Sequence, residues 1–147
     1  MKTYGDYEAR VRESFARQKM MGQLKVALLE VRAGEVVFEM PFQDAFTQQH
    51  GFMHAGAMTT ALDTAAGFAA YSVMPADAGV LTIELKVSLM RPARAPRFRI
   101  VGRVLKPGRS VTFTEAVAYG LDNDAEVEVA RLTASMMVVS GRDEVTG

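Results

Sequence analysis

The segment between Asp44 and Asp77 constrains the fold most, because it carries a single formal charge, at Asp63. Residues 55–73 are dense in Ala, Gly, Thr and Met, which is typical in length and composition of a buried helix. A membrane span is an alternative for so weakly charged a segment, but its three threonines, its central aspartate and its lack of flanking basic residues argue against one. We therefore predict a helix that protein surrounds on nearly all sides.

The remaining segments predict one further helix and six strands. Tyr7, Val11 and Phe15 recur every four residues among charged residues, so residues 4–21 are expected to form a helix that stops at Gly22. Alternation of apolar and polar residues, bounded by Pro and Gly or by the Asp-Asn-Asp of residues 122–124, indicates the strands. These are residues 24–31, 35–40, 80–90, 97–105, 110–119 and 127–139.

This order of elements favours an α+β fold, in which a long antiparallel sheet curls around one internal helix. At 147 residues the chain has the length of about one domain, and no linker or repeat divides it. We expect a single domain, with residues 1–22 as an N-terminal helix and residues 23–141 as its main body.

Composition excludes several classes of function. Seventeen basic and seventeen acidic residues balance, which argues against a general binder of nucleic acid or anionic membrane. The absence of cysteine excludes disulfides, thiolate metal sites and a cysteine nucleophile. Two histidines make no credible metal set, and neither a P-loop nor a dinucleotide fingerprint occurs, so we predict no metal and no cofactor. The polar N-terminus is unlike a secretory signal, and a cytoplasmic location is expected.

Asp63 is the first candidate catalytic residue. A carboxylate within an apolar helix costs several kcal/mol to desolvate unless it is paired or hydrogen-bonded. One interpretation is structural, with Asp63 capping a loop or accepting backbone N–H groups. The other is a general base or nucleophile whose basicity burial raises.

The start of the helix is the second candidate. Free backbone N–H groups at a helix N-terminus, with the positive end of the macrodipole behind them, can hold a carbonyl oxygen that gains negative charge. Small residues at Ala55 and Gly56 let a substrate approach the backbone closely. A lone histidine at such a place, here His54, is more often a structural hydrogen-bonding group than a catalyst.

The spacing of Ala55 and Asp63 bears on the quaternary structure. Eight residues separate them, which is about 12 Å along one helix, so they cannot both touch one carbonyl carbon from the same chain. If they cooperate, two antiparallel copies of the helix must meet, each Asp63 facing the start of the other helix. This hypothesis requires a two-fold dimer with two equivalent sites.

A run of basic residues is the third feature. The stretch from Leu85 to Thr114 holds eight basic residues and no acid. It is either a solvated sheet face defended by charge or a phosphate-binding rim with a cationic turn at 106–109. The eight are Lys86, Arg91, Arg94, Arg97, Arg99, Arg103, Lys106 and Arg109.

These motifs together resemble a known family. The His-Ala-Gly of residues 54–56, Asp63, and a Val-Leu-Thr-Ile-Glu-Leu-Lys-Val strand followed by Arg-Pro-Ala resemble the hotdog-fold acyl-CoA thioesterases, most of all the PaaI-like branch. The likeness runs over about residues 24–139. It implies an acyl-CoA substrate and a homodimer, commonly assembled as a dimer of dimers.

The resemblance also implies roles for individual residues. The Ala55 amide would polarise the thioester carbonyl, with Gln48 at the place where many members carry Asn, while Asp63 and Thr82 would direct water, or Asp63 would attack directly. His54 and Gly56 belong to the helix-start motif. The basic residues Arg91, Lys106 and Arg109 would hold the CoA phosphates.

Two other functions stay open on the sequence. A hydratase or dehydratase acting on acyl thioesters would pair His54 or His50 with Asp63. A non-catalytic acyl-CoA-binding module would bind such esters without consuming them.

Overall fold

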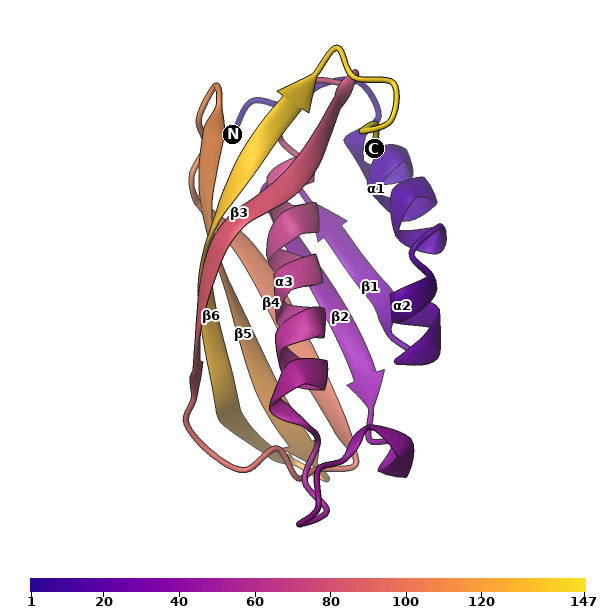
Figure 1. The fold of residues 1–147 in the computed structure, drawn as a ribbon, viewed down its shortest axis with the longest axis vertical. Helices are drawn as coiled ribbons and strands as arrows, with labels where there is room; N and C mark the ends of the chain where they lie inside the picture. Colours follow the sequence, from indigo (N-terminus) through magenta and orange to yellow (C-terminus); the bar gives the residue numbers. More distant parts are fainter.

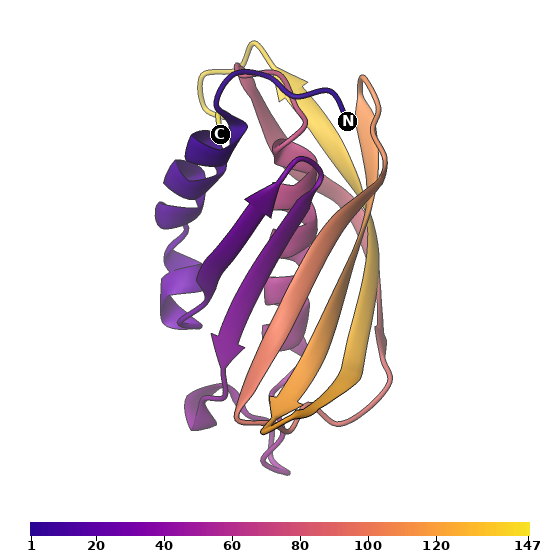
Figure 2. The ribbon, with the colours of Figure 1, turned by 180° about the vertical axis from the view of Figure 1, so that it is seen from behind.

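A computed structural model describes all 147 residues of the chain. Six strands form one antiparallel sheet in the order β1-β2-β4-β5-β6-β3, and it curls around a long helix (Figures 1 and 2). The α+β prediction is confirmed. The strands are β1 (Ala27–Arg32), β2 (Glu35–Pro41), β3 (Ala78–Leu89), β4 (Arg97–Lys106), β5 (Val111–Asp122) and β6 (Ala125–Ser140).

The central helix, α3 (Ala55–Tyr71), lies against the concave face of the sheet (Figure 1). Its sheet-facing residues are mostly alanine and are buried, so the backbone of the helix comes close to the strands. The closest approach is at Gly102 of β4, where an added Cβ would lie 2.2 Å from the carbonyl oxygen of Ala65. A glycine is required there because any side chain would push the helix off the sheet.

A Gly102→Ala substitution is therefore expected to lower the free energy of unfolding by about 1–3 kcal/mol, the usual cost of overpacking a core. Urea unfolding followed by circular dichroism measures this change. Gly22→Ala is the matched control, because nothing lies within 4 Å of a Cβ added there. Equal midpoints for Gly102→Ala and the parent protein would contradict the close-approach argument.

The helix is less enclosed than predicted. Nine of its residues are buried, but a stripe on the side away from the sheet stays partly open, and Asp63 lies within it. The stripe consists of Gly56, Thr59, Thr60, Asp63, Thr64 and Gly67. Neither α3 nor any other helix of the structure combines the length and the apolar character that crossing a membrane requires.

The N-terminal segment differs from its prediction. In place of one helix over residues 4–21 there are two, α1 (Tyr7–Ala16) and α2 (Lys19–Gln23). The break falls at Gln18, whose extended backbone (φ −77°, ψ 100°) redirects the chain and allows Met21 and Leu24 to be buried. A short 3-10 helix, η1 (Asp44–Phe46), follows β2.

The first helix closes one side of the molecule. Val11 is fully buried, and the Phe15 ring packs 5.2 Å from the Phe38 ring of β2 and 5.9 Å from the Phe68 ring of α3. Beyond α3, on the other side, strand β3 ends the sheet and pairs only with β6. One face of α3 is thus lined by α1, and the opposite side of the helix borders a sheet edge with unpaired backbone groups.

Candidate functional site

The start of α3 presents a free backbone donor. His54 is the N-cap, and its ring nitrogen Nδ1 accepts a hydrogen bond of 2.8 Å from the backbone N–H of Gly56. The N–H groups of Ala57 and Met58 donate to the carbonyl of His54. Ala55 is exposed, and its N–H has no partner in the chain, so it points outward at the positive end of the helix.

Gln48 lies beside this donor, in a turn that precedes the helix. Its side-chain oxygen accepts from the backbone N–H of His50 at 2.5 Å, which leaves the amide nitrogen free to donate. Gln48 and Ala55 line one cavity of about 410 Å³. Most of the lining is apolar and comes from the turn, from α3 and from the segment after β3, where Arg91 also borders the cavity.

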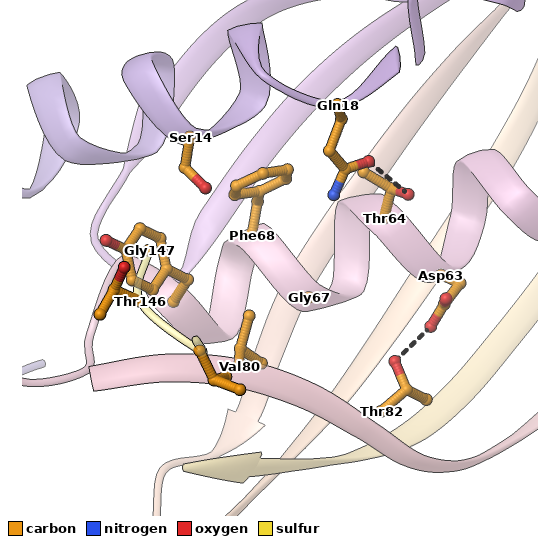
Figure 3. A pocket seen from close by; sticks show the side chains of 12 residues that line it. Ser14, Gln18, Asp63, Thr64, Gly67, Phe68, Val80, Thr82, Thr146 and Gly147 are labelled. Atoms are coloured by element: carbon orange, nitrogen blue, oxygen red, sulfur yellow. Dashed lines mark hydrogen bonds between the residues drawn. The ribbon is translucent and has the colours of Figure 1, made fainter. Parts of the chain in front are cut away.

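Asp63 and Thr82 form the second half of the predicted site (Figure 3). The Thr82 hydroxyl of β3 donates to Oδ1 of Asp63 at 2.8 Å, and Oδ2 has no partner. Both residues line a cavity of about 170 Å³ over the second half of α3. Asp63 was expected to be enclosed by protein. In the single chain it is only half-buried, because it belongs to the open stripe of the helix.

The structure does not bring all predicted residues together within one chain. Gln48, Ala55 and Arg91 share one cavity, while Asp63 and Thr82 share another. His54 and Gly56 also border an apolar groove on the α2 side, with Met20 and Phe46 among its other residues. Arg109 lies at the opposite end of the molecule, in a cavity beside the end of α3, and Lys106 precedes the same turn.

The basic run divides into two groups. Arg97 and Arg103 of β4 form ion pairs with Glu39 and Glu35 of the neighbouring β2, with Arg103 at 2.7 Å from Glu35. Arg99 pairs with Glu126 of β6, across β5. The hydrogen bond to the Glu35 carboxylate raises the pKa of the Arg103 guanidinium above its ordinary value. For these three residues the interpretation as a charged sheet face is confirmed. The remaining basic residues, including Arg91, Lys106 and Arg109, have no carboxylate partner.

Most residues that line the cavity beside Asp63 were not predicted, among them Ser14, Gln18 and Gly67 and the C-terminal residues Val145, Thr146 and Gly147. Ser14 lies on α1 and Gln18 lies at the break between α1 and α2, and only the packing of α1 against α3 places them there. Gly67 could have been singled out from the sequence, because a glycine inside a helix lowers the stability of the helix and therefore indicates a packing or functional role.

Comparison with known proteins decides the family. A sequence profile of the Thioesterase superfamily matches residues 50–127, more than half of the chain. The chain belongs to the thioesterase superfamily. The match includes the start of α3, the Asp63–Thr82 pair, and all three basic residues predicted to hold phosphates.

Solved structures agree with this membership. The crystal structure of a thioesterase family protein from Silicibacter pomeroyi is 44% identical, with a TM-score of 0.90 over 92% of this chain and 99% of the other. The PaaI protein of the E. coli phenylacetic acid degradation operon has a TM-score of 0.81 over 92% of this chain and 94% of its own, at 16% identity. The predicted hotdog fold and the predicted thioesterase family are confirmed, and the chain shares the fold of PaaI.

Curated relatives of this superfamily member include two archaeal proteins that are provisionally named esterases. The one from Saccharolobus solfataricus is 35% identical over 92 residues, which is 63% of this chain and 65% of that protein. The one from Halobacterium salinarum is 35% identical over 80 residues, 51% of this chain and 53% of its own length. The alignments thus span between about half and two thirds of these relatives.

Proposed function

We propose that the protein is an acyl-CoA thioesterase, which hydrolyses an acyl-CoA thioester to a free acid and CoA. One observation carries the proposal: a carboxylate hydrogen-bonded to a hydroxyl faces a cavity, in a member of a superfamily of thioesterases. The free Ala55 N–H at the start of the same helix supplies a donor for the oxygen that gains charge.

The two halves of the site work together in a two-fold dimer. Asp63 and Thr82 of one subunit face Ala55 and Gln48 of the partner subunit, with the two α3 helices antiparallel. The unpaired edge of β3 supports this arrangement, because it exposes Leu81 and Ile83 by 50% and 48% and offers a second copy both apolar side chains and backbone groups. The half-open stripe of α3 beside this edge would then be covered, with the cavity over Asp63 and Gly67 enclosed between the two subunits.

A second association, of two dimers, is part of the proposal. Phe113 and Met137 are 46% and 44% exposed on neighbouring strands of the sheet, where a monomer would carry polar side chains. They extend the apolar surface of the β3 edge across the sheet. This surface supports a dimer of dimers.

Hydrolysis follows from these positions. The thioester carbonyl oxygen accepts from the Ala55 N–H and the Gln48 amide, so the negative charge of the tetrahedral intermediate forms against two donors and a helix N-terminus. The partner subunit's Asp63 takes a proton from a water that Thr82 helps to hold, and the water oxygen bonds to the carbonyl carbon. Direct attack by Asp63 is the other course, giving an anhydride that water then cleaves. In the first course the tetrahedral intermediate collapses, the C–S bond breaks, and the proton that Asp63 took from the water passes to the sulfur, so that CoA leaves as the thiol. In the second course CoA leaves as the thiolate when the anhydride forms and takes a proton from solvent, and the water that cleaves the anhydride restores the Asp63 carboxylate.

The CoA phosphates are assigned to Arg91 of one subunit and to Lys106 and Arg109 of the partner subunit, because antiparallel α3 helices place the end of one helix near the start of the other. Arg91→Ala is expected to raise KM for acyl-CoA about tenfold and to leave kcat unchanged, because the lost hydrogen bond to a charged phosphate is made equally by the bound substrate and by the transition state. Steady-state kinetics at two salt concentrations measure this. Arg99→Ala is the matched control, because Arg99 is already paired with Glu126. An equal KM change in both variants would contradict the assignment.

A free-thiol release assay with short, medium, long and aromatic acyl-CoAs tests the proposed activity. Thiol release above the rate without protein is the expected result. If no acyl-CoA is consumed but calorimetry detects binding, the chain is an acyl-CoA-binding module. If an enoyl-CoA gains water without loss of CoA, it is a hydratase.

A further inference from the structure

Gly67 lies in the interior of α3, where a glycine has no conformational reason to be. Its φ is not positive, and a Cβ added to it would meet no atom within 4 Å. Gly102 shows the contrast, because its lack of a side chain is what lets α3 approach the sheet. Glycine in a helix interior destabilises the helix relative to alanine. The open space above Gly67 is therefore the feature that the glycine preserves.

That space is continuous with the carboxylate. Gly67 follows Asp63 by four residues, so the two lie on one face of α3, one turn apart. Both line the cavity of about 170 Å³, and Figure 3 shows the bare helix backbone at Gly67 between Phe68 and the Asp63–Thr82 pair. An acyl group whose carbonyl carbon is next to Asp63 extends from there over Gly67.

The cavity limits both the size and the chemistry of that group. An apolar cavity of about 150 Å³ holds benzene, so this one accommodates about six to eight non-hydrogen atoms. The wall on the α1 side is polar, with the hydroxyl of Ser14 and the amide of Gln18 directed toward α3. The C-terminal residues Val145, Thr146 and Gly147 close the end of the cavity beyond Phe68. The Gln18 oxygen accepts from Thr64 at 3.5 Å, which leaves its N–H groups for a ligand.

We propose that Gly67 and Gln18 are specificity-determining residues of an acyl site. Gly67 provides the space for a compact acyl group, and Gln18 donates to a hydrogen-bonding substituent at the far end of that group. This inference rests on the proposed thioesterase activity and names its substrate class: short acyl-CoA esters that carry a polar substituent remote from the carbonyl.

The size of the group is tested with Gly67→Leu. We expect kcat/KM for hexanoyl-CoA to fall about thirtyfold relative to that for acetyl-CoA, because the leucine fills the space that only the longer chain needs. Gly67→Ala should raise Tm by about 2–4 °C with a smaller loss on hexanoyl-CoA. The matched control is Gly22→Ala, a helical glycine that borders no cavity, which should raise Tm without changing the ratio of the two substrates.

The polar end is tested with Gln18→Met, which keeps the length of the side chain and removes its amide. The parent protein is expected to prefer 6-hydroxyhexanoyl-CoA to hexanoyl-CoA about tenfold, and the variant to lose this preference. The amide of Gln18 makes no capping hydrogen bond to α2, so the helix should be unaffected.

The outcomes separate the two proposals. If the parent protein hydrolyses no acyl-CoA, the thioesterase proposal fails. If it does, but Gly67→Leu lowers all rates equally or Gln18→Met keeps the preference, the acyl-site inference is overturned and the activity stands.

Discussion

The Asp63→Asn variant should fold normally and lose at least about two orders of magnitude in kcat, the usual effect of removing a general base. Asn keeps an oxygen that can accept from the Thr82 hydroxyl, so the 2.8 Å hydrogen bond between α3 and β3 survives. It cannot take a proton from water or attack a thioester. The effect should therefore appear in turnover, with little change in the affinity for a non-hydrolysable acyl-CoA analogue.

Single-turnover thiol release and calorimetric binding of the analogue, made on the same preparation, measure these two quantities. Asp44→Asn is the matched control, because that exposed carboxylate lies on η1 and borders neither cavity of the site. Near-normal turnover in Asp63→Asn would show that the carboxylate is structural, which is the other interpretation of a charged residue within this helix.

The arrangement of strands and central helix was predictable because local patterns determine it. Most strands alternate apolar and polar residues and end close to a Gly or Pro, β5 ends at the Asp-Asn-Asp turn of residues 122–124, and α3 is distinguished by its small residues and single charge. The break between α1 and α2 at Gln18 could not be predicted, because residues 4–21 keep a helical pattern throughout. It depends on the burial of Met21 and Leu24 against distant parts of the chain.

The candidate site residues could be predicted where a residue type or a position in the helix is unusual. Asp63 was found as the lone charge of an apolar helix, and Ala55 from its position at the start of that helix. Burial was misjudged, because the open stripe of α3 depends on tertiary packing and not on the composition of the helix. Ser14 and Gln18 could not be assigned, since only the docking of α1 on α3 places them beside Asp63.

Replacing Ala55 with proline should remove the proposed carbonyl donor and leave the helix intact. Ala55 is the first residue of α3, where proline is favoured, because its missing N–H is one that the helix does not use. The preceding residue, His54, has φ −58° and ψ 138°, a conformation that a following proline requires. We expect kcat to fall about 10²–10³-fold, as when one oxyanion donor is lost, with Tm unchanged.

Ala55→Ser is the matched control, because it keeps the backbone N–H, and it should retain most of the parent turnover. Mixing the two inactive variants then tests whether the site is shared. If each site takes Ala55 from one subunit and Asp63 from the other, random exchange of Ala55→Pro and Asp63→Asn subunits gives half heterodimers, each with one intact site, and about a quarter of the parent activity. No recovery after the subunits have exchanged would exclude a site built across the two-fold axis. Recovery of activity would require a site built across the two-fold axis, because neither variant alone has both an Ala55 N–H and an Asp63 carboxylate.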